Sequence, residues 1–88
     1  MISFFVFGKE GCPICKKVYH KIEYFKNSYL PESEITYYDM ETVDGLAEGA
    51  YRDISEVPTV VLEKDGKELA RWIKVPPTYK KLREILGI

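Results

Sequence analysis

The chain has 88 residues, which is enough for one small domain with a single core and too few for a second domain. Hydrophobic residues make up 45% and charged residues 31%, a balance typical of a soluble globular protein and not of a disordered or membrane-spanning chain. The 13 basic and 14 acidic residues leave a formal net charge of -1, so no broad positive field would attract nucleic acid or an anionic membrane. We therefore expect one domain over residues 1–88, a monomer whose partners are selected by local shape.

The N-terminal part of the chain predicts a strand followed by a long helix. Residues 2–7 are almost wholly apolar, which favours a central strand covered on both faces. Pro13 provides a favourable first helical position, and the pattern predicts a helix that runs from there to about Tyr29. Its apolar positions recur every three or four residues and predict a buried stripe of Cys15, Val18, Ile22, Phe25 and Tyr29.

A second strand and a second helix are predicted next. Residues 34–40, "EITYYDM", are rich in β-branched and aromatic side chains, which favour a strand. Residues 42–53 predict a helix that is weakened by Gly45 and Gly49. The expected buried stripe of this helix consists of Val43, Leu46, Ala47, Ala50 and Ile54.

The C-terminal part predicts a hairpin and a closing helix. "TVVLE" and "ELARWI" are strand-like, and they flank residues 64–67, whose Asp-Gly pair is a strong hairpin signal. Residues 76–86 predict a helix with Pro77 near its start and with Tyr79, Leu82 and Leu86 facing inward.

The predicted order is therefore β-α-β-α-β-β-α, an α/β fold. A strand, helix, strand passage usually makes a parallel pair, and the later hairpin adds antiparallel strands. We expect a mixed four-stranded sheet with helices on both faces. In such sheets a functional site tends to lie beyond the carboxyl end of a central strand, in the turn that leads to the next helix. Residues 9–15, "KEGCPIC", occupy that turn.

The two cysteines of this turn predict thiol chemistry. The thiolate is the nucleophilic form of cysteine, and the start of a helix stabilises it through unpaired N–H groups and the positive end of the helix dipole. Cys12 is expected at that position. Cys15 follows three residues later on the same face, where it can reach Cys12 and displace a partner bound to it. Lys9, Lys16 and Lys17 add a small further stabilisation of the thiolate.

Other interpretations of these residues stay open. A Cys-x-x-Cys pair is also half of a zinc site, although zinc normally takes four ligands and the chain has only one histidine, His20. A purely structural disulfide is less favoured, because closing so short a loop removes little chain entropy. We interpret His20 as a solvated helix residue, and Lys9 as either part of the site or an ordinary loop charge.

The stretch "EVPTVVL", residues 56–62, adds a second candidate segment. Proline cannot donate to a sheet ladder, so Pro58 before a strand is expected at an edge, a strand start or a special turn. A cis bond there would leave Val57 free to pair its backbone with an extended substrate. The alternative is a simple proline at the start of a strand.

The N-terminus and the cysteine count bear on location. Residues 1–8 lack the basic head, longer apolar stretch and small-residue cleavage site of a secretory signal. No run approaches the length of a membrane span. Only Cys12 and Cys15 are present, whereas small secreted domains usually carry several cysteines. We therefore expect a cytoplasmic protein.

Together these motifs resemble the glutaredoxin and thioredoxin superfamily. The resemblance rests on Cys12-Pro13-Ile14-Cys15 after a first strand, on Lys9 three residues before Cys12, and on Val57-Pro58-Thr59 before a hairpin. It covers almost the whole chain in the expected order of elements. It implies that Cys12 is the nucleophile, that Cys15 is the resolving thiol, and that Pro58 is a cis-proline facing the pair while Val57 binds the substrate backbone.

The chain resembles both branches of the superfamily. Its length, Lys9 and the Cys-Pro-x-Cys form are similar to glutaredoxin, whereas Val57-Pro58-Thr59 and "KDGKELARW" are similar to thioredoxin. Ile14 replaces the tyrosine common in glutaredoxins, and Gly11 replaces the tryptophan usual in thioredoxins. Glutaredoxins follow their last strand with a Gly-Gly and an acidic pair that hold glutathione, but here the chain continues "IKVPPTYKK".

The sequence thus predicts a thiol-disulfide oxidoreductase that reduces protein disulfides without a bound cofactor. Its Cys12–Cys15 disulfide would be re-reduced by glutathione or by a flavoprotein of the thioredoxin reductase type. The alternative from another class is a metal-binding module, in which two chains combine their cysteines around zinc or an iron-sulfur cluster.

Overall fold

The computed structural model describes residues 1–88. The elements follow the predicted order, with small differences at their ends: β1 (Ile2–Gly8), α1 (Cys15–Tyr29), β2 (Glu34–Asp39), α2 (Val43–Tyr51), β3 (Thr59–Lys64), β4 (Lys67–Ile73) and α3 (Tyr79–Leu86).

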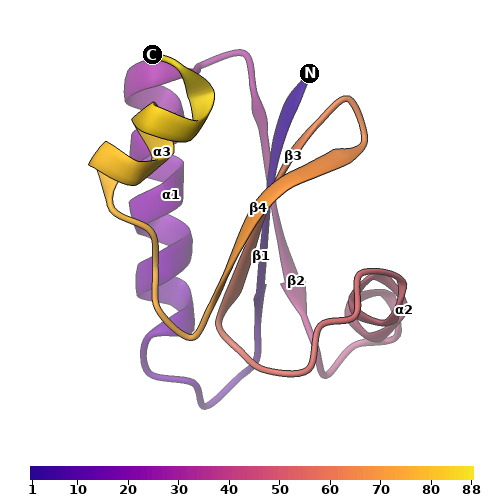
Figure 1. Ribbon diagram of the computed structural model, residues 1–88. Coiled ribbons are helices and arrows are strands. Elements are labelled where there is room, and N and C mark those ends of the chain that lie inside the picture. The colour runs from indigo at the N-terminus through magenta and orange to yellow at the C-terminus, as the bar shows by residue number, and fades with distance from the viewer.

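The four strands form one mixed sheet in the order β2-β1-β3-β4. β1 pairs with β2 in parallel and with β3 in antiparallel orientation, and β3 pairs with β4 in antiparallel orientation. The almost wholly apolar β1 is therefore an interior strand, as predicted. Figure 1 shows the sheet nearly edge-on, with β1 and β3 at its centre.

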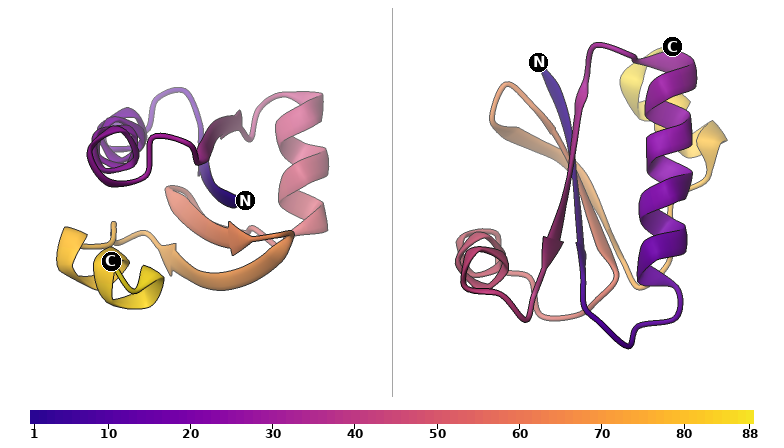
Figure 2. Two further views of the ribbon diagram at one scale, coloured as in Figure 1. Left: turned by 90° about the horizontal axis from the view of Figure 1, so that it is seen from above. Right: turned by 180° about the vertical axis from the view of Figure 1, so that it is seen from behind.

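Helices cover both faces of the sheet. α1 and α3 lie together on one face, and α2 lies alone on the other, at the end of the sheet that holds the β1–α1 turn (Figures 1 and 2). The main core lies between the sheet and the α1–α3 pair. Its fully or almost fully buried members are Phe4, Val6, Val18, Ile22, Phe25, Val60, Leu62 and Leu82. Burying each such side chain contributes about 1.5–3 kcal/mol, so this layer supplies most of the hydrophobic stabilisation.

α1 ends at Tyr29 as predicted, but it differs from its prediction in its first residue and in the burial of its last. It begins at Cys15 and not at Pro13, because Pro13 and Ile14 lie in a turn and the first helical hydrogen bond runs from the N–H of Val18 to the carbonyl of Ile14. At the other end Tyr29 was expected in the buried stripe but is 42% exposed. As the last residue of α1 it packs against the Phe25 ring, with 4.9 Å between centroids, and does not enter the core.

The predicted buried stripe of α2 is wrong within the helix, and only Ile54, which lies after its end, is half-buried. Val43, Leu46, Ala47 and Ala50 are exposed, and the residues of α2 that are buried are Gly45 and Gly49. α2 lies so close to the end of β2 that a Cβ on Gly45 would overlap the carbonyl oxygen of Asp39. Gly45 and Gly49 weaken the helix by propensity, yet they form its contact face. A larger side chain at Gly45 would not allow this close approach.

An ion-pair network fixes the chain after α2 to the sheet. The Arg52 guanidinium donates to Glu63 on β3 at 2.9 Å and to Glu48 on α2 at 2.6 Å. The same guanidinium lies 4.1 Å from the centre of the Phe5 ring. This pairing explains how Glu63 can be buried beneath α2, because a buried carboxylate needs a charged partner.

The C-terminal elements follow their predictions, except that α3 begins at Tyr79 and leaves Pro77 outside the helix. Lys64 pairs with Lys67 across a two-residue turn, and Asp65 and Gly66 both have positive φ, as the Asp-Gly signal predicts. α3 is capped by Thr78, whose hydroxyl accepts from the N–H of Lys81 at 3.1 Å. Leu82 is fully buried in the core. No helix of the chain has both the length and the apolar character needed to cross a membrane.

Candidate active site

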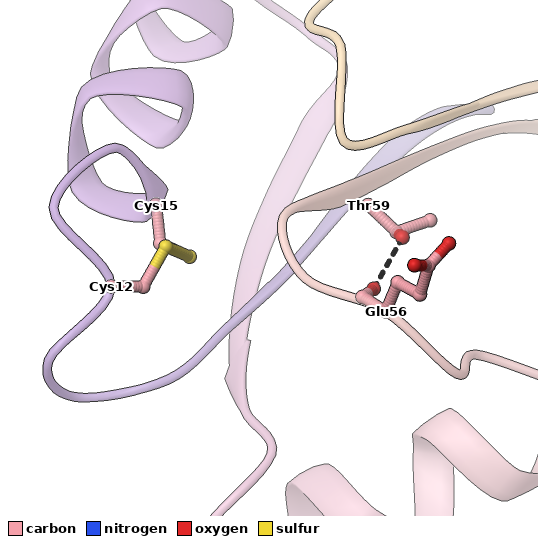
Figure 3. The surroundings of a disulfide bond; sticks show 4 residues. All are labelled: Cys12, Cys15, Glu56 and Thr59. Carbon is pink, nitrogen blue, oxygen red and sulfur yellow. Dashed lines mark hydrogen bonds between the residues drawn. A yellow bond between two sulfur atoms is a disulfide. The ribbon is translucent and has the colours of Figure 1, made fainter.

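Cys12, in the turn after β1, and Cys15, the first residue of α1, form a disulfide. Their Cα atoms are 5.5 Å apart, within the usual range for a disulfide. This turn follows the carboxyl end of the central strand β1, which is where the sequence predicted the site. Figure 3 shows the disulfide turned toward the segment that carries Glu56 and Thr59.

The two cysteines differ in exposure. Cys15 is the first residue of α1 and is fully buried, at 0% exposure. Cys12 lies in the preceding loop and is only half-buried. An incoming thiol or disulfide therefore has access to Cys12, whereas Cys15 is accessible only from within the site.

The start of α1 provides positive electrostatic potential beside the disulfide. The helix has no side-chain cap at Ile14 and no acidic residue in its first turn. The N–H groups of that turn are therefore not neutralised by a carboxylate or a hydroxyl, and they favour negative charge on a nearby sulfur. The prediction that Cys12 itself lies in the first turn is wrong, because Cys12 precedes the cap residue; Cys15 occupies that turn.

The segment Val57–Thr59 lies opposite the disulfide. The peptide bond between Val57 and Pro58 is cis, which confirms the conformation expected for this proline. Pro58 is buried and Val57 is half-buried. The hydroxyl of Thr59 donates to the carbonyl of Glu56 at 2.6 Å and holds the loop closed (Figure 3).

The structure brings Lys9 to the predicted site. A hollow of about 230 Å³ beside the disulfide is lined by Lys9, Glu10, Gly11, Cys12, Lys16, Tyr37 and Asp39. The two lysines bring positive charge to it and the carboxylates of Glu10 and Asp39 bring negative charge. The ammonium of Lys16 lies 4.3 Å from the centre of the Tyr37 ring. The predicted residues Lys9 and Cys12 thus share one hollow. His20, by contrast, is exposed on α1 and has Glu23 as its neighbour at 3.5 Å.

Tyr37 and Gly8 belong to the site, and neither was among the predicted site residues. Tyr37 comes from β2 and Gly8 ends β1. A Cβ on Gly8 would lie 2.8 Å from the Cβ of Cys15 and 2.9 Å from Cζ of Tyr37, with the Tyr37 hydroxyl closer still. Glycine at the end of a strand signals such a close approach. The signal that could have revealed it is therefore Gly8 directly before the cysteine motif.

The Tyr37 hydroxyl is a neutral hydrogen-bond donor at ordinary pH. Partial burial raises its pKa above the usual value, and the carboxylates of Asp39 and Glu10 raise that pKa further. The hydroxyl therefore keeps its proton next to the buried cysteine.

Lys74 is a further neighbour that was not predicted. Its backbone N–H donates to the carbonyl of Pro58 at 2.7 Å, directly after Ile73 pairs with Thr59 at the end of β4. The loop after β4 therefore runs alongside the segment that faces the disulfide. No motif in the sequence around Lys74 signals this contact, because the contact joins two loops that are distant in the sequence.

Other parts of the molecule offer less for chemistry. Two larger hollows, of about 570 Å³ and 470 Å³, lie on either side of the end of α1, and Tyr29 lines both of them. The first is also lined by the start of β1, and the second by α3. Neither of them contains a cysteine or histidine. The chain has no group of three or more His, Cys, Asp or Glu residues arranged to hold a metal ion. We therefore place the site at the smaller hollow, where the disulfide is.

No protein-family model and no curated protein matches the sequence. Among solved structures, thioredoxin 1 from Thermosipho africanus matches with a TM-score of 0.77 and 18% identity, over 97% of this chain and 90% of that chain. Thioredoxin O2 from Arabidopsis thaliana, in its oxidised state, matches with a TM-score of 0.80 and 22% identity, over 99% of this chain and 73% of that chain. Fasciola hepatica thioredoxin matches with a TM-score of 0.75 and 27% identity, over 98% of this chain and 78% of that chain.

The chain has a thioredoxin-like fold. This confirms the resemblance to the superfamily and the predicted α/β order with its mixed four-stranded sheet. Within this thioredoxin-like fold the chain carries a Cys-x-x-Cys disulfide at the start of α1. The similarity to glutaredoxin in particular, which rests on Lys9 and the Cys-Pro-x-Cys form, stays a prediction.

Proposed function

We propose that the protein is a thiol-disulfide oxidoreductase that reduces disulfides of other proteins with its Cys12–Cys15 dithiol. The observation that carries this proposal is the disulfide itself, with a half-buried Cys12 and a fully buried Cys15 at the start of a helix. The thioredoxin-like fold of the chain supports it.

In the first step, the Cys12 thiolate of the reduced protein attacks one sulfur of a substrate disulfide. A bond forms between the Cys12 sulfur and that substrate sulfur, and the other substrate sulfur leaves as a thiolate. Cys12 has this role because it is the accessible sulfur. The uncapped first turn of α1 and the ammonium of Lys9 favour its thiolate form.

In the second step, the sulfur of Cys15 attacks the sulfur of Cys12. The Cys12–Cys15 bond forms, and the bond between Cys12 and the substrate breaks, releasing a second substrate thiolate. The substrate gains two electrons, the dithiol loses them, and the two thiol protons pass through water to the product thiolates. Burial suits Cys15 to this role because it keeps other disulfides from reaching its sulfur.

The surroundings of the disulfide support an extended protein segment as substrate. In our proposal the backbone of Val57, in the loop opposite the disulfide, pairs with that segment beside Pro58. Apolar side chains near the site are exposed, with Ile14 at 41% and Ile73 at 46%. Covering them would favour a protein substrate over a small polar disulfide.

The electron donor that we propose is a flavoprotein of the thioredoxin reductase type, with glutathione as the second possibility. The loop after β4 begins Lys74-Val75-Pro76, without the Gly-Gly and acidic pair with which glutaredoxins hold glutathione. We place this reaction in the cytoplasm, where such reductants keep thiols reduced. The reduction potential of the Cys12–Cys15 pair tests the choice of donor.

Single substitutions of the two cysteines test the function. Cys12→Ser should abolish reduction of a protein disulfide, because the attacking sulfur is gone. Cys15→Ser should accumulate a mixed disulfide between Cys12 and the substrate, because the resolving sulfur is gone. Insulin reduction measures turnover, and non-reducing gels with mass spectrometry detect the trapped species. Equal, partial activity of both variants would contradict the assignment of the two roles.

The metal-binding alternative is tested on the same preparation. A colourless protein without stoichiometric zinc or iron, and with the mass of a single chain, fits the oxidoreductase. A dimer that holds a metal through Cys12 and Cys15 would overturn it, because those sulfurs would then be ligands and not a redox pair.

A further inference from the structure

Lys74 has an unusual backbone conformation for its residue type. Left-handed φ values occur here at three glycines, two aspartates and one lysine: Gly11, Gly66, Gly87, Asp53, Asp65 and Lys74. Glycine adopts this region freely, and aspartate is among the residues enriched there. Lysine has neither advantage, and Lys74 has a φ of 70°. Outliers of this kind cluster at functional sites, where the surrounding structure holds them in place.

Backbone hydrogen bonds within the chain hold Lys74 beside the candidate site. Its N–H donates to the carbonyl of Pro58 at 2.7 Å, and the preceding Ile73 is paired with Thr59. Figure 3 shows Thr59 on the segment that the disulfide faces. The backbone of Lys74 is thus attached to the loop along which we propose that the substrate lies.

The charge of Lys74 is available to a ligand. Lys74 is exposed, and none of the ion pairs within the chain includes it. Glu56, an acidic residue of the facing loop, points its side chain away from the disulfide (Figure 3). Ile73 and Val75, on either side of Lys74, are 46% and 69% exposed. A cation between two exposed apolar side chains would bind best to a substrate segment that carries an acidic residue among apolar ones.

We propose that Lys74 is a specificity-determining residue, whose ammonium binds a carboxylate close to the disulfide of the substrate. This inference rests on the proposed function and names a substrate class for it, disulfides flanked by acidic residues. The carboxylate source that we favour is an acidic protein segment. Glutathione also carries carboxylates and is the second source that the experiment separates.

The expected effect is local and modest. With a net charge of -1 the protein has no strong overall field, so the attraction acts only at short range. Exposed ion pairs of this kind alter rates or affinities by about two- to fivefold at low salt. High salt should reduce the effect, because screening acts most strongly on exposed charges.

The experiment compares two peptides that differ only in charge. Each peptide contains one intramolecular disulfide, flanked by Glu in one peptide and by Gln in the other. The reduced protein is mixed with excess peptide, and its oxidation is followed by acid quench and alkylation of free thiols. The wild type should react with the Glu peptide about two- to fivefold faster at low salt. Lys74→Met and Lys74→Gly should bring this ratio close to one, and Lys74→Arg should keep it.

Two further variants separate the charge of Lys74 from backbone strain and from the general effect of removing a lysine. Glycine adopts the left-handed backbone freely, so Lys74→Gly removes the charge without adding strain. Lys67→Met removes another exposed lysine, at the hairpin turn on the far end of the sheet from the disulfide, and should leave the ratio unchanged (Figure 1).

Glutathione disulfide is the third substrate. If Lys74→Met slows only the Glu peptide, the carboxylate belongs to a protein segment. If Lys74→Met slows glutathione disulfide by the same factor, Lys74 binds the carboxylate of glutathione. A Glu-to-Gln ratio that is the same in the wild type and in Lys74→Met overturns the proposal for Lys74. A wild type that reduces none of the three disulfides overturns the proposed function itself.

Discussion

Gly8 shows how a residue without a side chain shapes the site. The position that its Cβ would occupy is already filled by the Tyr37 ring and hydroxyl and by the Cβ of Cys15. The absence of a Cβ lets β1, β2 and the start of α1 meet at one point. The buried Cys15 is thus held between two strands as well as by its own helix, which keeps its sulfur in a fixed position.

Gly8→Ala should destabilise the oxidised protein by about 1–3 kcal/mol, because an added methyl group would overpack this contact. Urea unfolding followed by circular dichroism measures the change. The same substitution in a Tyr37→Phe background should cost less, because the closest atom, the hydroxyl, is absent. An equal cost in both backgrounds would show that the Tyr37 hydroxyl is not the limiting contact.

The elements obey local signals where the contact is local and depart from them where it is not. The hairpin between β3 and β4 follows its prediction, because turn chemistry involves neighbouring residues. α2 instead turns Gly45 and Gly49 toward the sheet and exposes its larger side chains. Its contact face is set by how closely the helix must approach β2.

The two glycines of α2 should respond differently to alanine. Gly45→Ala should cost about 3 kcal/mol, because its Cβ would overlap the backbone of Asp39, which cannot move aside. Gly49→Ala should change stability by less than about 1 kcal/mol, because its Cβ would meet only the flexible end of Met40 and alanine favours the helix.

Thermal and urea unfolding of the wild type, Gly45→Ala and Gly49→Ala measure this difference in stability. Ala47→Gly is the matched control on the exposed face, where a loss of about 1 kcal/mol reflects helix propensity alone. Similar costs for Gly45→Ala and Gly49→Ala would contradict the close approach of α2 to β2.

On the scale of the whole molecule, the site is assembled from parts that are distant in sequence. The radius of gyration is 12.1 Å, the value of about 12 Å expected of a compact chain of this length. Within it, the β1–α1 turn provides the cysteines, β2 provides Tyr37, and the loops before β3 and after β4 provide Pro58 and Lys74. The redox behaviour of the pair therefore depends on the folded molecule and not on the motif alone.

The reduction potential of the Cys12–Cys15 pair tests the proposed electron donor. We expect a value near the roughly -270 mV of thioredoxin, which suits a dedicated reductase. Counting free thiols after equilibration in glutathione buffers of graded ratio measures it. A value of about -200 to -230 mV, in the glutaredoxin range, would instead indicate that glutathione keeps the pair reduced.

The sequence by itself determined the order of the elements, the position of β1 in the sheet and the two segments that carry the candidate site. These features depend on signals within a few residues of one another: the apolar run of β1, the Asp-Gly turn, the spacing of Cys12 and Cys15, and the proline before β3. Local chain geometry is enough to specify them.

Only the tertiary structure decided which face of α2 is buried, that Tyr29 is exposed, and that Tyr37 and Lys74 lie at the site. Each of these depends on how closely two segments approach after the chain has folded. The burial of Gly45 follows from its distance to Asp39 on β2, and the place of Lys74 follows from its bond to Pro58. Such contacts leave no periodic pattern in the sequence, because close packing selects for complementary shape between segments that meet only after folding.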